Sequence, residues 1–292
     1  MSKRWIATLL LATATTFAQA EPPKPLLWKV SDADNSVYLM GSFHLLKPGD
    51  YPLAPSTDAA FEDAEKVVFE LSPQEMNDPS LGPRMQQAGT RTDGKTLQQT
   101  LPEATWKQLE AWATRRGANA AMFQGMEPWL ASLVISITEM QLLGLDPKLG
   151  LDKHFADRAV AAGKPVEGLE TGAQQIEMFD GMDEKEQLQS LQEALAEMAT
   201  MEAEIGKLHD LWRQGDADAL FAGTGAEMKA DYPLLYDRLN KDRNLAWMPR
   251  LRALLDQSKE DDTLVVVGAM HLLGEDGVIA LLKAQGYTVE RL

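Results

Sequence analysis

The sequence contains no cysteine and only four histidines among its 292 residues. The absence of cysteine excludes a disulfide framework, a thiolate zinc site, an iron–sulfur cluster and a cysteine nucleophile. Basic residues are also scarce, because 28 lysines and arginines stand against 44 aspartates and glutamates, which gives a formal charge of −16. Such a charge argues against a nucleic-acid partner, which requires a basic face, and against docking on anionic lipid.

The first 20 residues have the pattern of a secretory signal peptide. Lys3 and Arg4 form a positive start, Trp5–Phe17 is a short apolar run, and Ala18-Gln19-Ala20 fits the small-x-small cleavage pattern. The run is too short for a comfortable transmembrane span. The sequence therefore predicts a mature protein of residues 21–292 that is periplasmic or secreted and has no stable membrane anchor.

Strand patterns lie at both ends and in the middle of the chain, with long helical patterns between them. The expected strands are Leu26–Val30, Ser36–Met40, Lys66–Leu71, Lys164–Glu170, Thr263–Val267 and Tyr287–Leu292. The expected helices include Pro102–Arg116, Trp129–Leu143, Asp152–Ala162, Thr171–Phe179 and a long stretch over Asp183–Trp212. This order predicts one α/β domain with a central mixed sheet and large helical insertions at about 75–150 and 180–257.

One local pattern occurs twice. The segments Ser36–Leu46 and Leu264–Leu273 each contain a buried strand, then Gly-x-x-His, then Leu-Leu. Because glycine permits a tight backbone turn, His44 and His271 are expected at the carboxyl ends of two strands. In open α/β sheets that edge is where ligands bind. The two histidines are therefore the centre of a candidate site, although a histidine in a strand-end loop can also be purely structural.

Glu70 and Glu170 also lie at the ends of predicted strands. Two histidines with one or two carboxylates suit a divalent ion such as zinc, manganese or cobalt, and a metal-bound water could attack a carbonyl. The alternatives are that Glu70 is a solvated strand end or an ion-pair partner. Glu170 could instead stabilise the N-terminus of the helix that begins near Thr171.

The two remaining histidines are expected on the surface, because His154 and His209 are both flanked by charged residues.

Other catalytic patterns are absent from the sequence. It has no His-Glu-x-x-His, no Gly-x-Ser-x-Gly, no phosphate-binding glycine loop and no dinucleotide fingerprint. Ordinary zincins, α/β-hydrolases and nucleotide-binding enzymes therefore lose support.

The sequence resembles the TraB/GumN family, which includes the Tiki metalloproteases of animals. The resemblance covers nearly all of the mature chain, and the helical middle carries little of it. This family has a fold similar to that of erythromycin esterase (EreA) and the haem-binding ChaN-like proteins. The segments that carry the resemblance are Leu27–Val30, Val37–His44, Val67–Leu71, Gly150–Asp152, Lys164–Thr171 with Gln174 and Gln175, Arg243–Asn244, Val267–Gly274 and Gly286–Tyr287.

The resemblance implies a metal-dependent hydrolytic site with His44 and His271 at its core. It implies that Glu70 is a metal ligand or general base and that Glu170 is a further acidic member. Arg243 would hold a substrate carboxylate or stabilise an oxyanion, and its alternative is a surface ion pair. The implied metal ligands are His44, Glu70 and His271, and the ion is a divalent metal: Mn, Co or Zn.

We therefore expect an exported metal-dependent hydrolase, first of all a peptidase, that acts on a peptide or small-molecule substrate. One alternative is a non-catalytic periplasmic protein that binds or sequesters a peptide or a metal-containing ligand. Another is an esterase-like hydrolase, suggested by fold analogy alone. The sequence determines neither the substrate nor the oligomeric state.

Overall fold

The computed structural model describes residues 21–196, 201–256 and 261–292. The predicted signal peptide lies outside these residues. The described strands form one sheet in the order β4-β3-β5-β2-β1-β6. Neighbours among β4, β3, β5 and β2 are parallel, whereas β1 is antiparallel to β2 and β6. The strands are β1 (Leu26–Ser31), β2 (Ser36–Ser42), β3 (Lys66–Leu71), β4 (Val166–Glu170), β5 (Thr263–Gly268) and β6 (Thr288–Arg291). The predicted mixed sheet of an α/β fold is confirmed.

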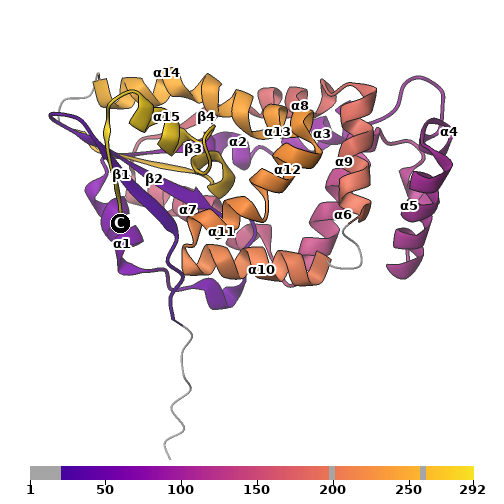
Figure 1. Ribbon diagram of the computed structural model, residues 1–292, viewed down its shortest axis with the longest axis horizontal. Coiled ribbons are helices and arrows are strands. Elements are labelled where there is room, and N and C mark those ends of the chain that lie inside the picture. Colours follow the sequence, from indigo (N-terminus) through magenta and orange to yellow (C-terminus); the bar gives the residue numbers. More distant parts are fainter. Residues whose placement is uncertain (1–20, 197–200, 257–260) are drawn as a thin grey trace, which may run out of the picture.

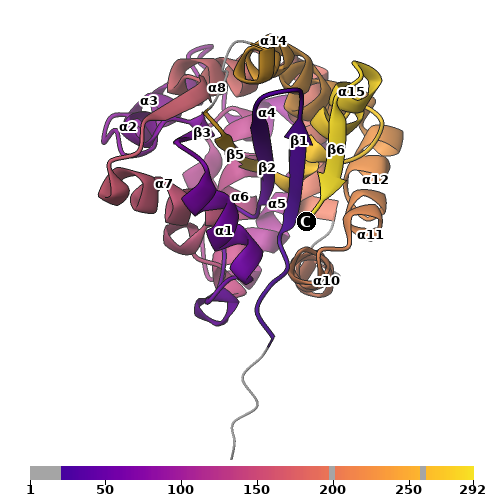
Figure 2. The ribbon, with the colours of Figure 1, turned by 90° about the vertical axis from the view of Figure 1, so that its left-hand side faces the viewer.

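Helices surround the sheet and extend well beyond it (Figures 1 and 2). Those up to residue 162 are α1 (Pro55–Asp63), α2 (Pro73–Met76), α3 (Leu81–Ala88), α4 (Leu97–Thr100), α5 (Glu103–Arg115), α6 (Pro128–Leu142) and α7 (Leu151–Ala162). The later ones are α8 (Gly172–Asp180), α9 (Glu184–Ala196), α10 (Met201–Gln214), α11 (Ala217–Ala222), α12 (Gly225–Asp231), α13 (Pro233–Tyr236), α14 (Asp242–Asp256) and α15 (Val278–Ala284). No helix in the described ranges is long and apolar enough to cross a membrane.

The main core is built on the sheet. β2 and β5 are buried along their whole length, as is typical of central strands that are covered on both faces. Apolar side chains of α1, α7, α14 and α15 complete this core, among them Phe61, Phe155, Trp247 and Leu282. A second apolar cluster joins α5, α6 and α9 at the end of the molecule that lies away from β1 (Figure 1).

Two helix predictions need correction. The sequence favours Ser56 or Thr57 as the N-cap of a helix that runs through Glu65. The helix instead begins at Pro55 and ends at Asp63, with Ala54 as its N-cap, and neither Ser56 nor Thr57 caps it. Proline suits the first helical position because its missing N–H would have no partner there. The long stretch expected over Asp183–Trp212 contains two helices, α9 and α10, which run in different directions (Figure 1).

The prediction that His209 lies on the surface is wrong. Its side chain is 6% exposed, and its Nε2 lies 2.8 Å from Oδ2 of the buried Asp50. Arg213 donates to the other oxygen of the same carboxylate. His209 lies on the buried face of α10 with Ile205 and Trp212, because residues spaced three and four apart share a face. The charged neighbours that suggested exposure belong to the opposite face.

His154, also expected in solvent, is only partly exposed. Its ring centroid lies 4.8 Å from that of Tyr51, and burial lowers the pKa of the imidazole. This ring packing accounts for its partial burial, and no residue of the candidate site described below contacts it through a hydrogen bond given by the structure.

We predict that Asp50→Ala lowers the free energy of unfolding by about 3 kcal/mol, because it leaves the buried His209 and the partly buried Arg213 without their shared partner. The matched control is Asp58→Ala, since Asp58 pairs with Arg158 in a more exposed setting and such pairs contribute under about 1 kcal/mol. Urea unfolding followed by circular dichroism measures both losses. Equal losses in the two variants would contradict a structural role for the Asp50 cluster.

Candidate functional site

The carboxyl ends of the parallel strands meet at one edge of the sheet. His44 follows β2, Glu70 lies near the end of β3, and Glu170 ends β4. His271 lies in the short helix η6 (Ala269–Leu272) directly after β5. Arg243, in the first turn of α14, reaches this edge from the helical layer. The five residues expected from the sequence therefore lie in one cluster.

The repeated Gly-x-x-His pattern has a structural basis, because β2 and β5 are parallel neighbours with Gly41 opposite Val267. A Cβ atom added to Gly268 would lie 3.0 Å from Nε2 of His44 and 3.2 Å from Oε1 of Glu70. A Cβ on Gly41 would lie 3.1 Å from the Cα of Ala269. Glycine at these positions lets the site side chains and the next strand approach closely.

Arg243 is the centre of the cluster, since all five of its N–H groups have acceptors in the protein. Nε donates to Glu170 Oε1 at 2.8 Å, and Nη2 donates to Glu170 Oε2 at 2.8 Å and to Glu70 Oε2 at 2.6 Å. Nη1 donates to the Leu239 carbonyl at 3.3 Å and to His271 Nε2 at 2.9 Å. The two carboxylates raise the pKa of the guanidinium and outweigh the opposing effect of its burial. The implied substrate-holding role of Arg243 stays a prediction, because its donors are engaged within the protein.

His271 is held in one tautomer. Its Nδ1 lies 2.7 Å from Oδ1 of Asn244, whose Nδ2 donates to the carbonyl of Asp276 at 2.9 Å. The Asn244 oxygen must therefore accept, so Nδ1 carries the proton and Nε2 accepts from Arg243. Burial and the adjacent guanidinium lower the pKa of His271 to about 3, against the opposite influence of Glu70. This histidine is neutral at neutral pH.

Glu70 lies between the two histidines. Its Oε1 accepts from the backbone N–H of Gly268 at 2.7 Å and lies 3.8 Å from Nε2 of both His44 and His271. Burial alone would raise the pKa of this carboxyl. The positive charges around it, chief among them Arg243 while His271 is neutral, together with the Gly268 amide, hold the pKa well below its usual range.

Two side chains besides Arg243 hold Glu170 in place. Trp247 Nε1 donates to its Oε1 at 2.9 Å and Gln175 Nε2 to its Oε2 at 3.2 Å. The Trp247 ring also packs against His271, with ring centroids 4.4 Å apart. The N-terminus of α8 is capped by the Thr171 hydroxyl, which forms a capping box with Gln174. Glu170 is therefore not the cap of this helix, and its carboxylate faces Arg243 instead.

His44 differs from the other members because its side chain is 52% exposed, whereas those of Glu70, Glu170, Arg243 and His271 are 7–14% exposed. His44 lines a pocket of about 210 Å³, and Glu70, Asp152 and Gln175 also contribute to its wall. His44 is therefore the expected site residue that a bound molecule can reach most directly.

Asp152 orients the His44 ring. Its Oδ1 lies 3.2 Å from Nδ1 of His44 and accepts from the hydroxyl of Ser42 at 2.8 Å. Partial burial of the imidazole opposes its charged form, but the carboxylates of Asp152 and Glu70 outweigh that effect and raise the pKa of His44. Solvent reaches half of the ring and screens part of this attraction. Nε2 is left facing Glu70 and the pocket.

The donor types of His44, Glu70 and His271 suit a divalent metal. Two ligands of one ion can lie up to about 4.2 Å apart when each bond is about 2.1 Å, so the 3.8 Å separations alone permit it. Yet residues 21–196, 201–256 and 261–292 contain no group of three or more such side chains arranged to hold a metal. The lone pair of His271 Nε2 is occupied by Arg243. In this arrangement the residues do not fit a bound ion.

Sequence reasoning did not single out Asp152, Asn244 or Trp247 as site residues. Asp152 stands beside Lys153, Asp157 and Arg158 in the charged stretch around His154, which predicts a solvated helix face. A signal for two of them was present, because Asp152 and Asn244 stand inside the segments that resemble the TraB/GumN family. Trp247 had no such signal: it lies one helical turn after Arg243, and only the path of α14 brings it to Glu170.

Comparison with known proteins identifies the family of the chain. The chain belongs to the TraB/PrgY/gumN family, whose model matches residues 26–291. It is 25% identical over 249 residues to the uncharacterized protein YbaP of Escherichia coli (strain K12), which covers 84% of this chain and 87% of that protein. YbaP of Shigella flexneri has the same values.

The chain is also similar to the metalloprotease TIKI2 of Danio rerio, with 23% identity over 303 residues. That match covers 87% of this chain and 58% of TIKI2. No solved structure matches the chain. The similarity to the EreA/ChaN-like fold that the family resemblance implies therefore stays a prediction.

We predict that Arg243→Met lowers the free energy of unfolding by about 3–5 kcal/mol, because Glu70 and Glu170 would remain buried without their shared cation. Adding Glu70→Gln and Glu170→Gln removes the uncompensated charges and should recover part of the loss. The control is Arg250→Met, since Arg250 pairs with Glu167 at the surface. Denaturant unfolding compares the variants, and an Arg243→Met variant as stable as the control would contradict the account.

Proposed function

We propose that the chain is a hydrolase that cleaves peptide bonds, with His44 as the group that activates water. The observation that carries this proposal is the half-exposed His44 ring, with Asp152 at Nδ1 and with Nε2 facing Glu70 beside a pocket. Membership of the TraB/PrgY/gumN family and the similarity to a protein named as a metalloprotease support the choice of a hydrolase and of peptides as its substrates.

The proposed reaction needs the neutral form of His44. Nε2 accepts a proton from a water molecule in the pocket while the water oxygen attacks the substrate carbonyl. Asp152 stabilises the imidazolium that results, in the manner of the acidic member of a catalytic triad. The imidazolium then gives the proton to the leaving nitrogen. Glu70 and the cluster around Arg243 do not exchange protons in this reaction. They hold the side chains at the sheet edge in place and provide a constant electrostatic field.

The sequence also predicts dependence on Mn, Co or Zn. The three implied ligands can bind such an ion only after Arg243 releases Nε2 of His271, so we assign no step to a metal.

We further propose that the chain is exported, on the basis of the pattern in residues 1–20. Mass spectrometry of the periplasmic fraction of an expressing bacterium tests this: a chain that begins at Glu21 supports export, and an unprocessed cytoplasmic chain contradicts it.

We predict that His44→Ala abolishes turnover of a peptide library while leaving the unfolding midpoint within about 3 °C of the original protein. The ring is half exposed and holds no buried charge in place, so its loss should cost little stability. The matched control is His154→Ala, which removes a histidine outside the cluster. If His44→Ala cleaves as well as the original protein, the proposed hydrolysis at this site is wrong, and ligand capture without product would favour a binding protein.

The pH dependence follows from the raised pKa of His44. Because the active base is the neutral imidazole, kcat/KM should rise as the pH increases through this pKa, above neutrality. Asp152→Asn removes the main attraction that keeps the proton on His44, so the rise should move to lower pH by about one unit or more. The rate profile of both proteins between pH 5 and pH 10 measures the shift. Identical profiles would exclude His44 as the titrating base.

For metal binding we predict that Arg243→Met binds Zn²⁺, Mn²⁺ or Co²⁺ more tightly than the original protein, because the lone pair of His271 becomes available. Isothermal titration calorimetry below the unfolding temperature measures this, and adding His271→Ala should remove the gain. Equal affinities for the original protein and Arg243→Met would show that a metal, if bound, does not use these residues.

A further inference from the structure

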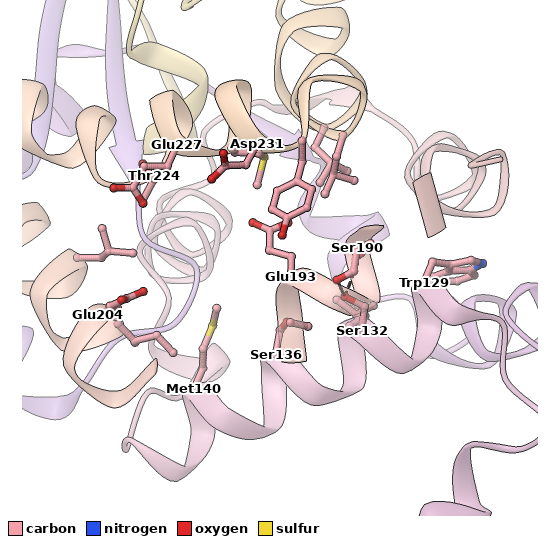
Figure 3. Close-up of a pocket in the computed structure, with 18 of the residues that line it drawn as sticks. Trp129, Ser132, Ser136, Met140, Ser190, Glu193, Glu204, Thr224, Glu227 and Asp231 are labelled. Atoms are coloured by element: carbon pink, nitrogen blue, oxygen red, sulfur yellow. Dashed lines mark hydrogen bonds between the residues drawn. The ribbon is translucent and has the colours of Figure 1, made fainter. Parts of the chain in front are cut away.

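An unassigned cavity of about 560 Å³ lies close to the candidate site, among helices α6, α8, α9, α10, α12 and α13. Figure 3 shows it between α6 and the helices that carry Glu193, Glu204 and Glu227. The proposed reaction uses none of the side chains that line it. Its volume is within the range of pockets that hold a ligand of several residues or a drug-sized molecule.

The inside of the cavity is largely apolar. Trp129, Leu133 and Met140 come from α6, Phe179 comes from α8, and Ile205 and Leu208 come from α10. Only a few hydroxyls interrupt this surface, and two of them, on Ser132 and Ser190, are hydrogen-bonded to each other at 2.9 Å. Such a surface favours apolar side chains of a ligand, because their burial removes apolar area from water.

The rim of the cavity is acidic. Among the described residues that line it, Glu193, Glu204, Glu227 and Asp231 carry carboxylates and none is Lys, Arg or His. Glu204, Glu227 and Asp231 are exposed. Glu227 and Asp231 lie four residues apart on α12, and Figure 3 shows them on the same side of the cavity. Like charges at this spacing destabilise a helix, and a cation bound between them would relieve the repulsion.

The cavity shares parts of its wall with the candidate site. Leu239 lines the cavity, and its carbonyl accepts a hydrogen bond from Arg243 Nη1. Thr224 also lines the cavity, and its hydroxyl lies 2.8 Å from the sulfur of Met270, next to His271. A ligand in the cavity therefore lies one residue layer from the cluster at the sheet edge.

We infer that this cavity binds a basic amphipathic peptide segment, with apolar side chains inside and Lys or Arg side chains at the acidic rim. The inference rests on the proposed function in one respect, namely that this segment belongs to the peptide that is cleaved. The charge of the whole chain, −16, favours the approach of the same kind of ligand. Anionic and neutral peptides lack the matching charge and should bind weakly.

The test uses binding, which needs no turnover. Three acetylated and amidated hexapeptides, Gly-Leu-X-Leu-X-Gly with X as Lys, Gln or Glu, are titrated into the full mature chain by calorimetry. The Lys peptide should bind at least about tenfold more tightly than the Gln and Glu peptides, and its affinity should fall as salt rises from about 0.05 to 0.5 M. Equal affinities for the three peptides would overturn the inference.

The decisive variant is Glu204→Gln/Glu227→Gln/Asp231→Asn, which leaves the five expected site residues intact. Its matched control, Glu110→Gln/Asp210→Asn/Glu290→Gln, changes the net charge by the same amount at exposed positions that do not line the cavity. We expect the first variant to lose the preference for the Lys peptide and the control to keep it. Loss in both variants would mean that net charge alone attracts the peptide, which contradicts a site in the cavity.

A second variant addresses the cavity itself. Ser136→Trp fills the cavity from α6 and should weaken binding of the Lys peptide even though every rim carboxylate remains. Unchanged binding would overturn the placement of the peptide in this cavity.

The experiments distinguish failure of this inference from failure of the proposed function. Cleavage by the original protein without preference for basic peptides contradicts only the inference, and tight binding of the Lys peptide without any cleavage contradicts only the hydrolase.

Discussion

The buried guanidinium of Arg243 is the interaction on which the site depends. Its planar fork matches the two oxygens of Glu170 and leaves two further donors for Glu70 and His271. Without this cation, two carboxylates at 11–12% exposure would face each other in a poorly solvated space. With it, Glu70 stays ionised and His271 stays neutral. A single residue thereby sets the charge of the whole sheet edge.

The sheet explains why residues so far apart in sequence meet. Parallel strands place their carboxyl ends at one edge, so β2, β3, β4 and β5 each deliver one side chain to the cluster. The helical segments between the strands then provide α7 with Asp152 on one side of His44 and α14 with Arg243 on the other side of Glu70. Other helices of these segments, among them α6, α9, α10 and α12, enclose the acidic cavity, which gives part of the negative charge of the chain a local role.

Much of this arrangement could be predicted from the sequence, because it follows from local patterns. The hairpin formed by the antiparallel strands β1 and β2, the buried strands and the repeated Gly-x-x-His depend on residues that are neighbours in the chain. The burial of His209 could not be predicted, since it depends on Asp50, which lies 159 residues earlier in the chain. Nor could the tautomer of His271, which depends on how Asn244 is itself held. Such features depend on contacts between residues far apart in the chain, so the polarity of the sequence neighbours does not determine them.

In this site Arg243 and Asn244 hold His271 neutral, while His44 remains the exposed group that titrates. Nitrogen-15 NMR of the imidazole rings in the full mature chain, between pH 4 and pH 10, observes both histidines separately. We expect His271 to stay neutral throughout with its proton on Nδ1, and His44 to titrate above its ordinary value. A His271 ring that gains a proton near pH 6.5, or that carries its proton on Nε2, would contradict this expectation.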